Sequence, residues 1–172
     1  MQSHSHSLVV EGTPEEAWSI LHPPPPKVGP DGRRLLVHGD VSIEVLETGD
    51  ETGKGLVRTC TFRVPKWLLS GGQARSFETI VEARPYETVR YLAVGKPLWS
   101  LAEGAHHFED LGEGRTKITF EETYKAFHPW MARLFEARVH AFISRDNQRL
   151  IKMALDQGIP YMRARRSGGT RT

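Results

Sequence analysis

An uninterrupted segment near the C-terminal end limits what this chain can fold into. Residues 129–155 read PWMARLFEARVHAFISRDNQRLIKMAL, with no Gly or Pro after Pro129. Pro129 suits a first helical turn, because its missing N–H would have no partner there. The segment predicts a helix of about 27 residues, about 40 Å long, and Gly158 and Pro160 are expected to end it. A helix of this length has to be covered by another layer of the protein.

One face of this predicted helix is mostly apolar, and one carboxylate interrupts it. At about 100° per residue, that face collects His128, Met131, Phe135, Val139, Phe142, Asp146, Leu150 and Met153. A buried charge is costly unless it has a partner or a wet cavity. Asp146 is therefore expected either to pair with Arg138 or Arg149 at the edge of the stripe, or to face a cavity.

The rest of the chain has the pattern of a sheet. Residues 4–10 alternate as a strand, and Thr13, Pro14 and Glu16 form a helix start with a capping box. Four prolines at 23–26 end that short helix. Further strands are predicted at 35–37, 41–46, 56–64, 75–83, 89–93, 100–110 and 116–124. Short polar turns between them favour an antiparallel meander.

These elements predict an α+β fold. A curved antiparallel sheet of about seven strands would wrap around the long C-terminal helix, with a short helix after the first strand. We expect residues 1–160 to form a single domain. Residues 161–172 contain four arginines and no acids, and are expected to be a disordered basic tail.

Composition excludes several classes of protein. Without the four tail arginines the formal charge of +2 becomes −2, a poor match to nucleic acid. No apolar run approaches the roughly 18 residues of a membrane span, and the N-terminus lacks the pattern of a secretory signal. Cys60 is the only cysteine, so neither an internal disulfide nor a multi-cysteine metal site is expected. These features predict a cytoplasmic protein without a metal or cofactor.

Several stretches make the chain resemble the START-like, or helix-grip, superfamily (SRPBCC), with its polyketide cyclase/dehydrase-type members, plant pollen-allergen-like carriers and lipid-transfer domains. The resemblance covers about residues 5–156 and rests on VVEGTPEEAWSIL, GLVRTCTF, ARSFETIVEARPYETVRY, HHFEDLGEGRTKITFEETY and RLIKMAL. It implies a ligand cavity between sheet and helix. It also suggests, as a reaction class, cyclisation or dehydration of a polyketide-like substrate.

Tryptophans concentrate at one end of the predicted sheet. In a meander, the connectors at 65–72, 95–99 and 125–130 share one end, whereas the polar turns at 48–55, 84–88 and 112–114 share the other. The first end carries Trp67, Trp99 and Trp130, which is unusual for exposed loops. We interpret them as a gate at the mouth of a cavity. Two alternatives stay open, a plug for the open end of the core and a weak membrane- or protein-contacting surface.

Three polar residues fall on predicted inward faces, namely His106, Glu122 and Asp146. Inside an apolar cavity, a His with carboxylates could act as general acid and base. The alternative is that they are structural, with Asp146 paired to an arginine. Arg58 lies on an inward face as well and could pair with one of the acids.

The sequence therefore leaves three functions open. The first is binding of a hydrophobic small molecule (lipid or polyketide-like), with sparse polar contacts in an aromatic-lined pocket. The second is a cyclase or dehydratase that uses His106 with Glu122 or Asp146. The third is an interaction module that uses the Trp-rich end. The predicted ligand-lining residues are Arg58, Phe62, Phe77, Tyr91, Phe108, Phe120, Phe135 and Phe142. Ligand identity and oligomeric state are not predicted.

Overall fold

The structure of the chain is a computed structural model that describes residues 2–38, 41–63, 71–96, 99–126 and 129–168. In the long helix, side chains are described at 145, 148 and 149 and from 151 to 167. The elements in chain order are β1 (Gln2–Val10), α1 (Pro14–Leu21), β2 (Arg34–His38), β3 (Val41–Thr48), β4 (Leu56–Arg63), β5 (Gln73–Arg84), β6 (Thr88–Lys96), β7 (Trp99–Gly112), β8 (Arg115–Ala126) and α2 (Pro129–Gly168).

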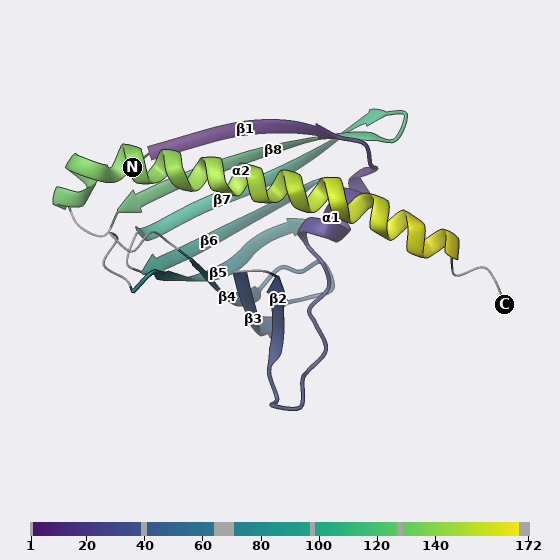
Figure 1. Cartoon of the computed structure of the whole chain (residues 1–172), viewed down its shortest axis with the longest axis horizontal. Helices are drawn as coiled ribbons and strands as arrows, with labels where there is room; N and C mark the ends of the chain where they lie inside the picture. The colour runs from purple at the N-terminus through teal and green to yellow at the C-terminus, as the bar shows by residue number, and fades with distance from the viewer. Residues whose placement is uncertain (1, 39–40, 64–70, 97–98, 127–128, 169–172) are drawn as a thin grey trace.

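The described strands form one antiparallel sheet in the order β1-β8-β7-β6-β5-β4-β3-β2. Strands β2 to β8 follow one another as a meander, and β1 adds to β8 at one edge (Figure 1). The weak alternating segment at 35–37 is thus a real edge strand, which brings the sheet to eight strands. This confirms the predicted α+β architecture, a curved sheet with a short helix after β1 and a long C-terminal helix.

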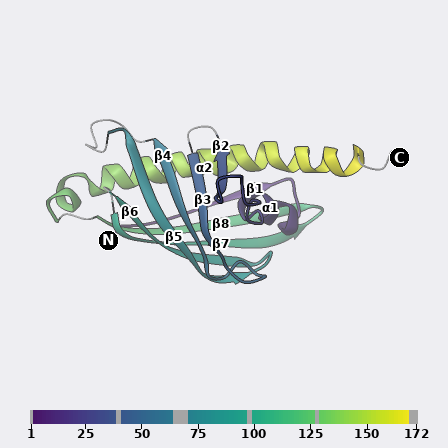
Figure 2. The same ribbon diagram turned by 90° about the horizontal axis from the view of Figure 1, so that it is seen from below.

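Irregular pairing helps to curve the sheet. The register shifts between Val45 and Glu47 in β3, between Ile80 and Glu82 in β5, and between Ala93 and Gly95 in β6. Each shift is the mark of a bulge, which bends a strand and increases its twist. Figure 2 shows the sheet bowed away from α2, so that its concave face looks toward the helix.

Helix α1 begins as its sequence predicts. The Thr13 hydroxyl accepts a hydrogen bond from the Glu16 N–H at 3.3 Å, and the Glu16 carboxylate accepts one from the Thr13 N–H at 3.0 Å. This capping box satisfies two backbone donors that a helix start would leave unpaired. The helix packs its buried side, Ala17 and Trp18, into the core beneath α2.

Helix α2 continues past the predicted stop. It runs to Gly168 with Pro160 inside it, so the expected end at Gly158 is wrong, and residues 161–168 are helical rather than a disordered tail. Its contacts explain the difference. A Cβ at position 158 would lie 2.5 Å from Ile20 Cδ1, so glycine lets α2 approach α1 closely. Ile159 is buried in the core, and Arg163 holds Glu16 with two hydrogen bonds of 2.7 and 2.9 Å.

The two ends of the sheet differ in what closes them. The polar turns lie at the end that α1 occupies, where Thr116 Oγ1 donates to the Gly12 carbonyl at 2.6 Å. At the opposite end, the connectors at 64–70, 97–98 and 127–128 lie outside the described residues. Among those described, α2 contacts α1, β1 and β8 most closely.

Candidate functional site

Strand alternation brings four predicted polar residues onto the concave face of the sheet. Arg58 comes from β4, Tyr91 from β6, His106 from β7 and Glu122 from β8, and buried neighbours at alternate positions mark the same face. The register places Tyr91 and Glu122 on either side of Gly104. Residues that are far apart in the chain thus form one polar band across the sheet.

Arg58 pairs with Glu78, a neighbour that the sequence interpretation missed. Arg58 Nε donates to Glu78 Oε2 at 2.8 Å, directly across the β4–β5 ladder. Ser76 Oγ donates to the other carboxylate oxygen at 3.0 Å, so Glu78 is held from both sides. The Arg58 and Glu78 side chains keep 23% and 16% of their surface accessible, although they lie inside the sheet's curvature.

His106 also has a partner that was not predicted. Its Nδ1 lies 3.2 Å from His22 Nε2, a residue at the C-terminal end of α1. The His106 ring packs edge-on against Phe120 and Tyr91, with centroid distances of 4.7 and 5.7 Å. One signal for His22 was present in the sequence, since it precedes four prolines that force the chain away and leave its side chain at the helix end.

Tyr91 and Glu122 occupy the middle of the band. The Tyr91 ring lies across Gly104, where a Cβ would be only 2.1 Å from Tyr91 Cζ. Glu122 is buried, with 3% of its surface exposed, and a hydrogen bond links it to Tyr124. In the register of β7 and β8, His106 lies opposite Phe120 and Glu122 lies opposite Gly104, so the two predicted residues are not direct cross-strand neighbours.

Burial keeps most of these groups uncharged. Desolvation, with the positive charge of Arg58, lowers the pKa of His22 to about 3, and desolvation holds the pKa of His106 well below its usual range. Desolvation likewise raises the pKa of Tyr91 well above 10. For Arg58, desolvation opposes the charged form, but the Glu78 carboxylate outweighs it and raises the pKa. The Arg58–Glu78 ion pair is therefore surrounded by neutral imidazole and phenol groups.

Cys60 is a poor candidate for a nucleophile. It is buried between Arg58 and Phe62 on β4, with 8% of its surface exposed. Desolvation, together with the negative charge of Glu78, raises the pKa of its thiol to about 12. A thiol that stays protonated at neutral pH does not attack substrates.

Packing along the concave face changes from one end to the other. At the α1 end, Trp18, Ile118, Leu155 and Ile159 belong to a core of large apolar side chains. Toward the other end, the buried side chains are small, with Ala74, Ala93 and Ala102 packed near Phe62 and Tyr124. The described side chains of the sheet in this region are thus much smaller than those at the α1 end. Arg58, Tyr91 and His106 lie where the large core gives way to this alanine-lined region, and Tyr91 touches both.

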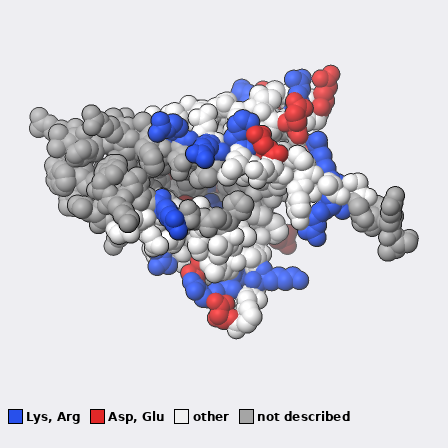
Figure 3. Space-filling model, viewed as in Figure 1, with Lys and Arg blue, Asp and Glu red and all other residues white. Residues whose placement is uncertain are grey.

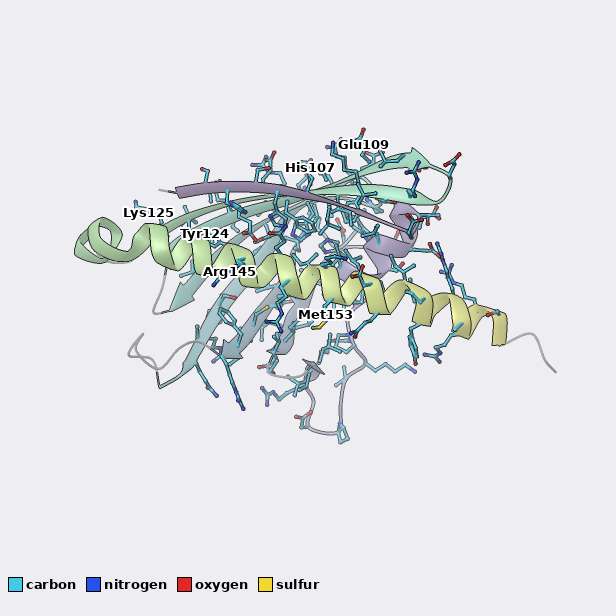
Figure 4. All side chains as sticks on the ribbon, turned by 45° about the horizontal axis from the view of Figure 1, so that its top comes forward. His107, Glu109, Tyr124, Lys125, Arg145 and Met153 are labelled. Atoms are coloured by element: carbon cyan, nitrogen blue, oxygen red, sulfur yellow. The ribbon has the colours of Figure 1, made fainter. Side chains whose placement is uncertain are left out.

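The described part of α2 borders a groove of about 510 Å³. Figure 3 shows the surface recessed beside the helix, with basic side chains along it. The residues that line this groove are Arg145, Gln148, Arg149, Lys152, Met153, Asp156 and Gln157. Met153, predicted on the inward stripe, keeps 38% of its surface exposed at this margin. Figure 4 shows Tyr124 between the sheet and α2, whereas His107 and Glu109 point away from the helix.

Of the aromatic residues predicted to line the ligand site, some lie on the concave face and one lies on the outer face. Phe108 and Phe120 are buried on the concave face, and Phe62 is half-buried beside the alanines. The prediction for Phe77 is wrong, because its side chain is 48% exposed on the outer face, under the guanidinium of Arg75. In β5 the inward positions are Ser76, Glu78 and Ile80 instead.

Six predicted residues have side chains outside the described part of the chain. They are the gate residues Trp67, Trp99 and Trp130, the lining residues Phe135 and Phe142, and the candidate acid Asp146. Their roles stay predictions. Arg149, one possible partner of Asp146, is exposed on α2.

The histidines of β1 offer no metal site together with their neighbours. His6 stacks on Phe120 with a centroid distance of 4.9 Å and lies 5.5 Å from the His4 ring. Within the described residues, both ring nitrogens of His6 are buried without a hydrogen-bond partner. No group of three His, Cys, Asp or Glu side chains in that part of the chain is arranged to hold a metal ion.

Comparison with solved structures identifies the fold. Ara h 8.0201 matches with a TM-score of 0.67 at 17% identity, over 93% of this chain and 98% of that protein. A START superfamily protein from Mycobacterium smegmatis matches with a TM-score of 0.58 at 11% identity, over 88% and 97% of the two chains. The di-domain ARO/CYC protein BexL from the BE-7585A biosynthetic pathway matches with a TM-score of 0.58 at 14% identity, over 93% of this chain and 47% of BexL.

These likenesses confirm the predicted START-like, helix-grip fold. No family model and no curated protein matches the chain. Among the described helices, none is both long enough and apolar enough to cross a bilayer.

Proposed function

We propose that this protein binds a hydrophobic small molecule, lipid or polyketide-like, between the concave face of the sheet and α2. One observation carries the proposal. Arg58, Tyr91 and His106 lie deep within the curvature of the sheet, yet each keeps accessible surface beside a region of small alanine side chains. An apolar space with a few convergent polar groups is the usual form of a small-molecule site.

The fold comparisons agree with this proposal without identifying the ligand. Two of the similar structures are described as a START superfamily protein and as an ARO/CYC protein. The Trp-rich gate would lie at the alanine-lined end, because the connectors at 64–70, 97–98 and 127–128 join the strands there. Entry of the ligand at that end, and a cytoplasmic location, are parts of the proposal.

The geometry favours a binding protein over a cyclase or dehydratase. His106 hydrogen-bonds to His22, and burial holds its pKa well below its usual range. A base of low pKa gains little from proton abstraction, so this pair is poorly matched to general acid–base work. The enzyme alternative would need Asp146 or the substrate itself to supply the missing group.

The proposed binding space above the alanines can be tested by introducing a larger side chain there. Ala93→Leu adds a larger side chain to the concave face of β6, where Ala93 is 4% exposed. If the space is open, the variant stays as stable as the wild type to within about 1 kcal/mol, and binding of the neutral dye Nile red weakens by about tenfold. Fluorescence titration and urea denaturation measure the two quantities.

Val94→Leu is the matched control, because Val94 is the next residue of β6 and lies 42% exposed on the outer face. It should change neither dye binding nor stability. Extraction of the purified protein with organic solvent, followed by mass spectrometry, should also release a hydrophobic compound. The proposal is wrong if Ala93→Leu costs about 1–3 kcal/mol, as in a filled core, while the wild-type protein binds no dye.

A further inference from the structure

We infer that the polar end of the ligand is an uncharged hydrogen-bond acceptor, such as an ester, ketone or amide carbonyl, which docks on the Nη groups of Arg58, rather than a carboxylate or phosphate. This inference rests on the proposed function, since it specifies the class of molecule that the same site takes. It depends on how Arg58 is held and on the charge of the groups around it.

The Arg58 side chain is held in place, but only some of its N–H donors have a hydrogen-bond acceptor among the described residues. A guanidinium carries five N–H donors, and in the described structure Glu78 takes the one on Nε. No other side chain or carbonyl among the described residues accepts a hydrogen bond from the two Nη groups. Ser76 anchors the far oxygen of Glu78, so the pair cannot easily rearrange to use these donors itself. The remaining N–H groups are therefore preorganised for an acceptor that arrives with the ligand.

Among the described residues, Glu78 already balances the positive charge that carries these donors. Glu78 neutralises Arg58 at a distance of 2.8 Å. The imidazoles of His22 and His106 add no positive charge at neutral pH, because desolvation keeps their pKa values low. Glu122, a further described carboxylate on the concave face, lies close enough to add to the effect of desolvation and raise the pKa of Tyr91. Glu122 can add negative charge to the site but never positive charge.

An anionic ligand would thus meet an excess of negative charge. A second carboxylate on Arg58 would leave the site with one uncompensated charge out of water, and an uncompensated buried charge is strongly unfavourable. An uncharged carbonyl meets the same N–H donors without that penalty, and hydrogen bonds to a charged group are stronger than those between neutral groups. The Arg58–Glu78 ion pair would therefore favour ligands whose polar group is uncharged over anionic ligands.

Three probes with the same chain separate these chemistries. Methyl decanoate carries an uncharged acceptor, decanoate an anion, and decane no polar group. In competition with Nile red at neutral pH, the wild-type protein should bind methyl decanoate about tenfold more tightly than decanoate and also more tightly than decane. Equal binding of ester and decane, or preference for decanoate, would overturn the inference, and this comparison needs no variant.

Removing the counter-charge should reverse the selectivity. Glu78→Gln keeps an oxygen for Arg58 Nε but leaves the guanidinium charge uncompensated, so decanoate should now bind more tightly than its methyl ester. Glu82→Gln is the matched control, because Glu82 is on the same strand and pairs with Arg84 at 3.4 Å and Arg90 at 4.0 Å, with a 41% exposed side chain. It should keep the wild-type preference. An unchanged preference in a folded Glu78→Gln protein would contradict the inference, whereas failure of all three probes to bind the wild type would reject the proposed function instead.

Discussion

At the scale of single residues, the buried His22–His106 pair makes the free energy of unfolding depend on pH. Burial lowers the pKa of His22 to about 3, whereas a histidine in an unfolded chain takes up a proton near 6.5. Between these two values the unfolded state binds more protons than the folded state. The free energy of unfolding should therefore decrease as the pH falls from 6.5 toward 3, and this contribution is fully present above 6.5.

Replacing His22 with Phe tests this linkage. The substitution keeps an aromatic ring beside Trp18 and Phe108, which lie 4.7 and 6.2 Å from the His22 ring, but removes the titrating group. We expect the urea midpoint of the wild type to fall between about pH 7 and pH 5, and that of His22→Phe to fall less. His107→Gln serves as control, since His107 is 44% exposed. Identical pH slopes for the wild type and His22→Phe would contradict the assignment.

The contact between Tyr91 and Gly104 is a second feature at the residue scale. A methyl group at position 104 would overlap the Tyr91 ring, which would have to leave its place in the polar band. Gly104→Ala should cost about 1–3 kcal/mol in a urea titration, as overpacking usually does. In a Tyr91→Ala background the same substitution should cost little, because the ring is gone. Equal costs in both backgrounds would mean that backbone strain, not the ring, requires the glycine.

At the scale of elements, the docking of α2 on α1 explains why the helix is longer than expected. The Ile20 side chain packs against Gly158, and the Ile159 side chain packs against Gly12. Arg163 donates two hydrogen bonds to Glu16 of the capping box. Hydrogen bonds from Arg163 lower the pKa of Glu16 from its usual value of 4.5. The stabilising contribution is thus present above pH 4.5 and is lost as the pH falls through the lower, folded-state pKa.

Arg163→Met should therefore lower the thermal midpoint at neutral pH. The difference from the wild type should narrow once the pH falls below 4.5 and Glu16 takes up a proton in the folded state. Arg165→Met, in the same part of α2, removes an arginine that contacts only the exposed ring of Tyr161 in the described structure and should have a smaller effect. A constant Arg163→Met difference across the whole pH range would show that lost packing, not the ion pair, is responsible.

At the scale of the whole molecule, the concave face divides into two regions. Large apolar side chains and α1 fill one end, and small side chains line the other, with the polar band at the boundary. If a ligand lies above the small side chains, as proposed, then the oriented polar groups beside them belong to a binding site rather than to a structural core. Stability would then come mostly from the α1 end and ligand recognition from the alanine-lined end.

The sequence alone determined the architecture, because hydrophobic periodicity, capping residues and turn chemistry act over a few neighbouring residues. It placed the strands, the capping box of Thr13 and Glu16 and the concave positions of Arg58, His106 and Glu122. Alternation alone does not say which face of a strand is buried, and for that reason it does not distinguish the inward position predicted for Phe77 from the outer one that it occupies. Because β5 carries apolar side chains on both faces, its sequence pattern is equally compatible with either face being buried.

Only the tertiary structure decided which residues meet and where α2 ends. Glu78 joins Arg58 through the β4–β5 register, His22 joins His106 through the placement of α1, and Arg163 joins Glu16 across more than 100 positions of the chain. Pro160 is tolerated inside α2 because the docked turn around Ile159 outweighs one missing backbone hydrogen bond. Such pairings depend on distances between segments remote in sequence, and α2 owes its full length to them.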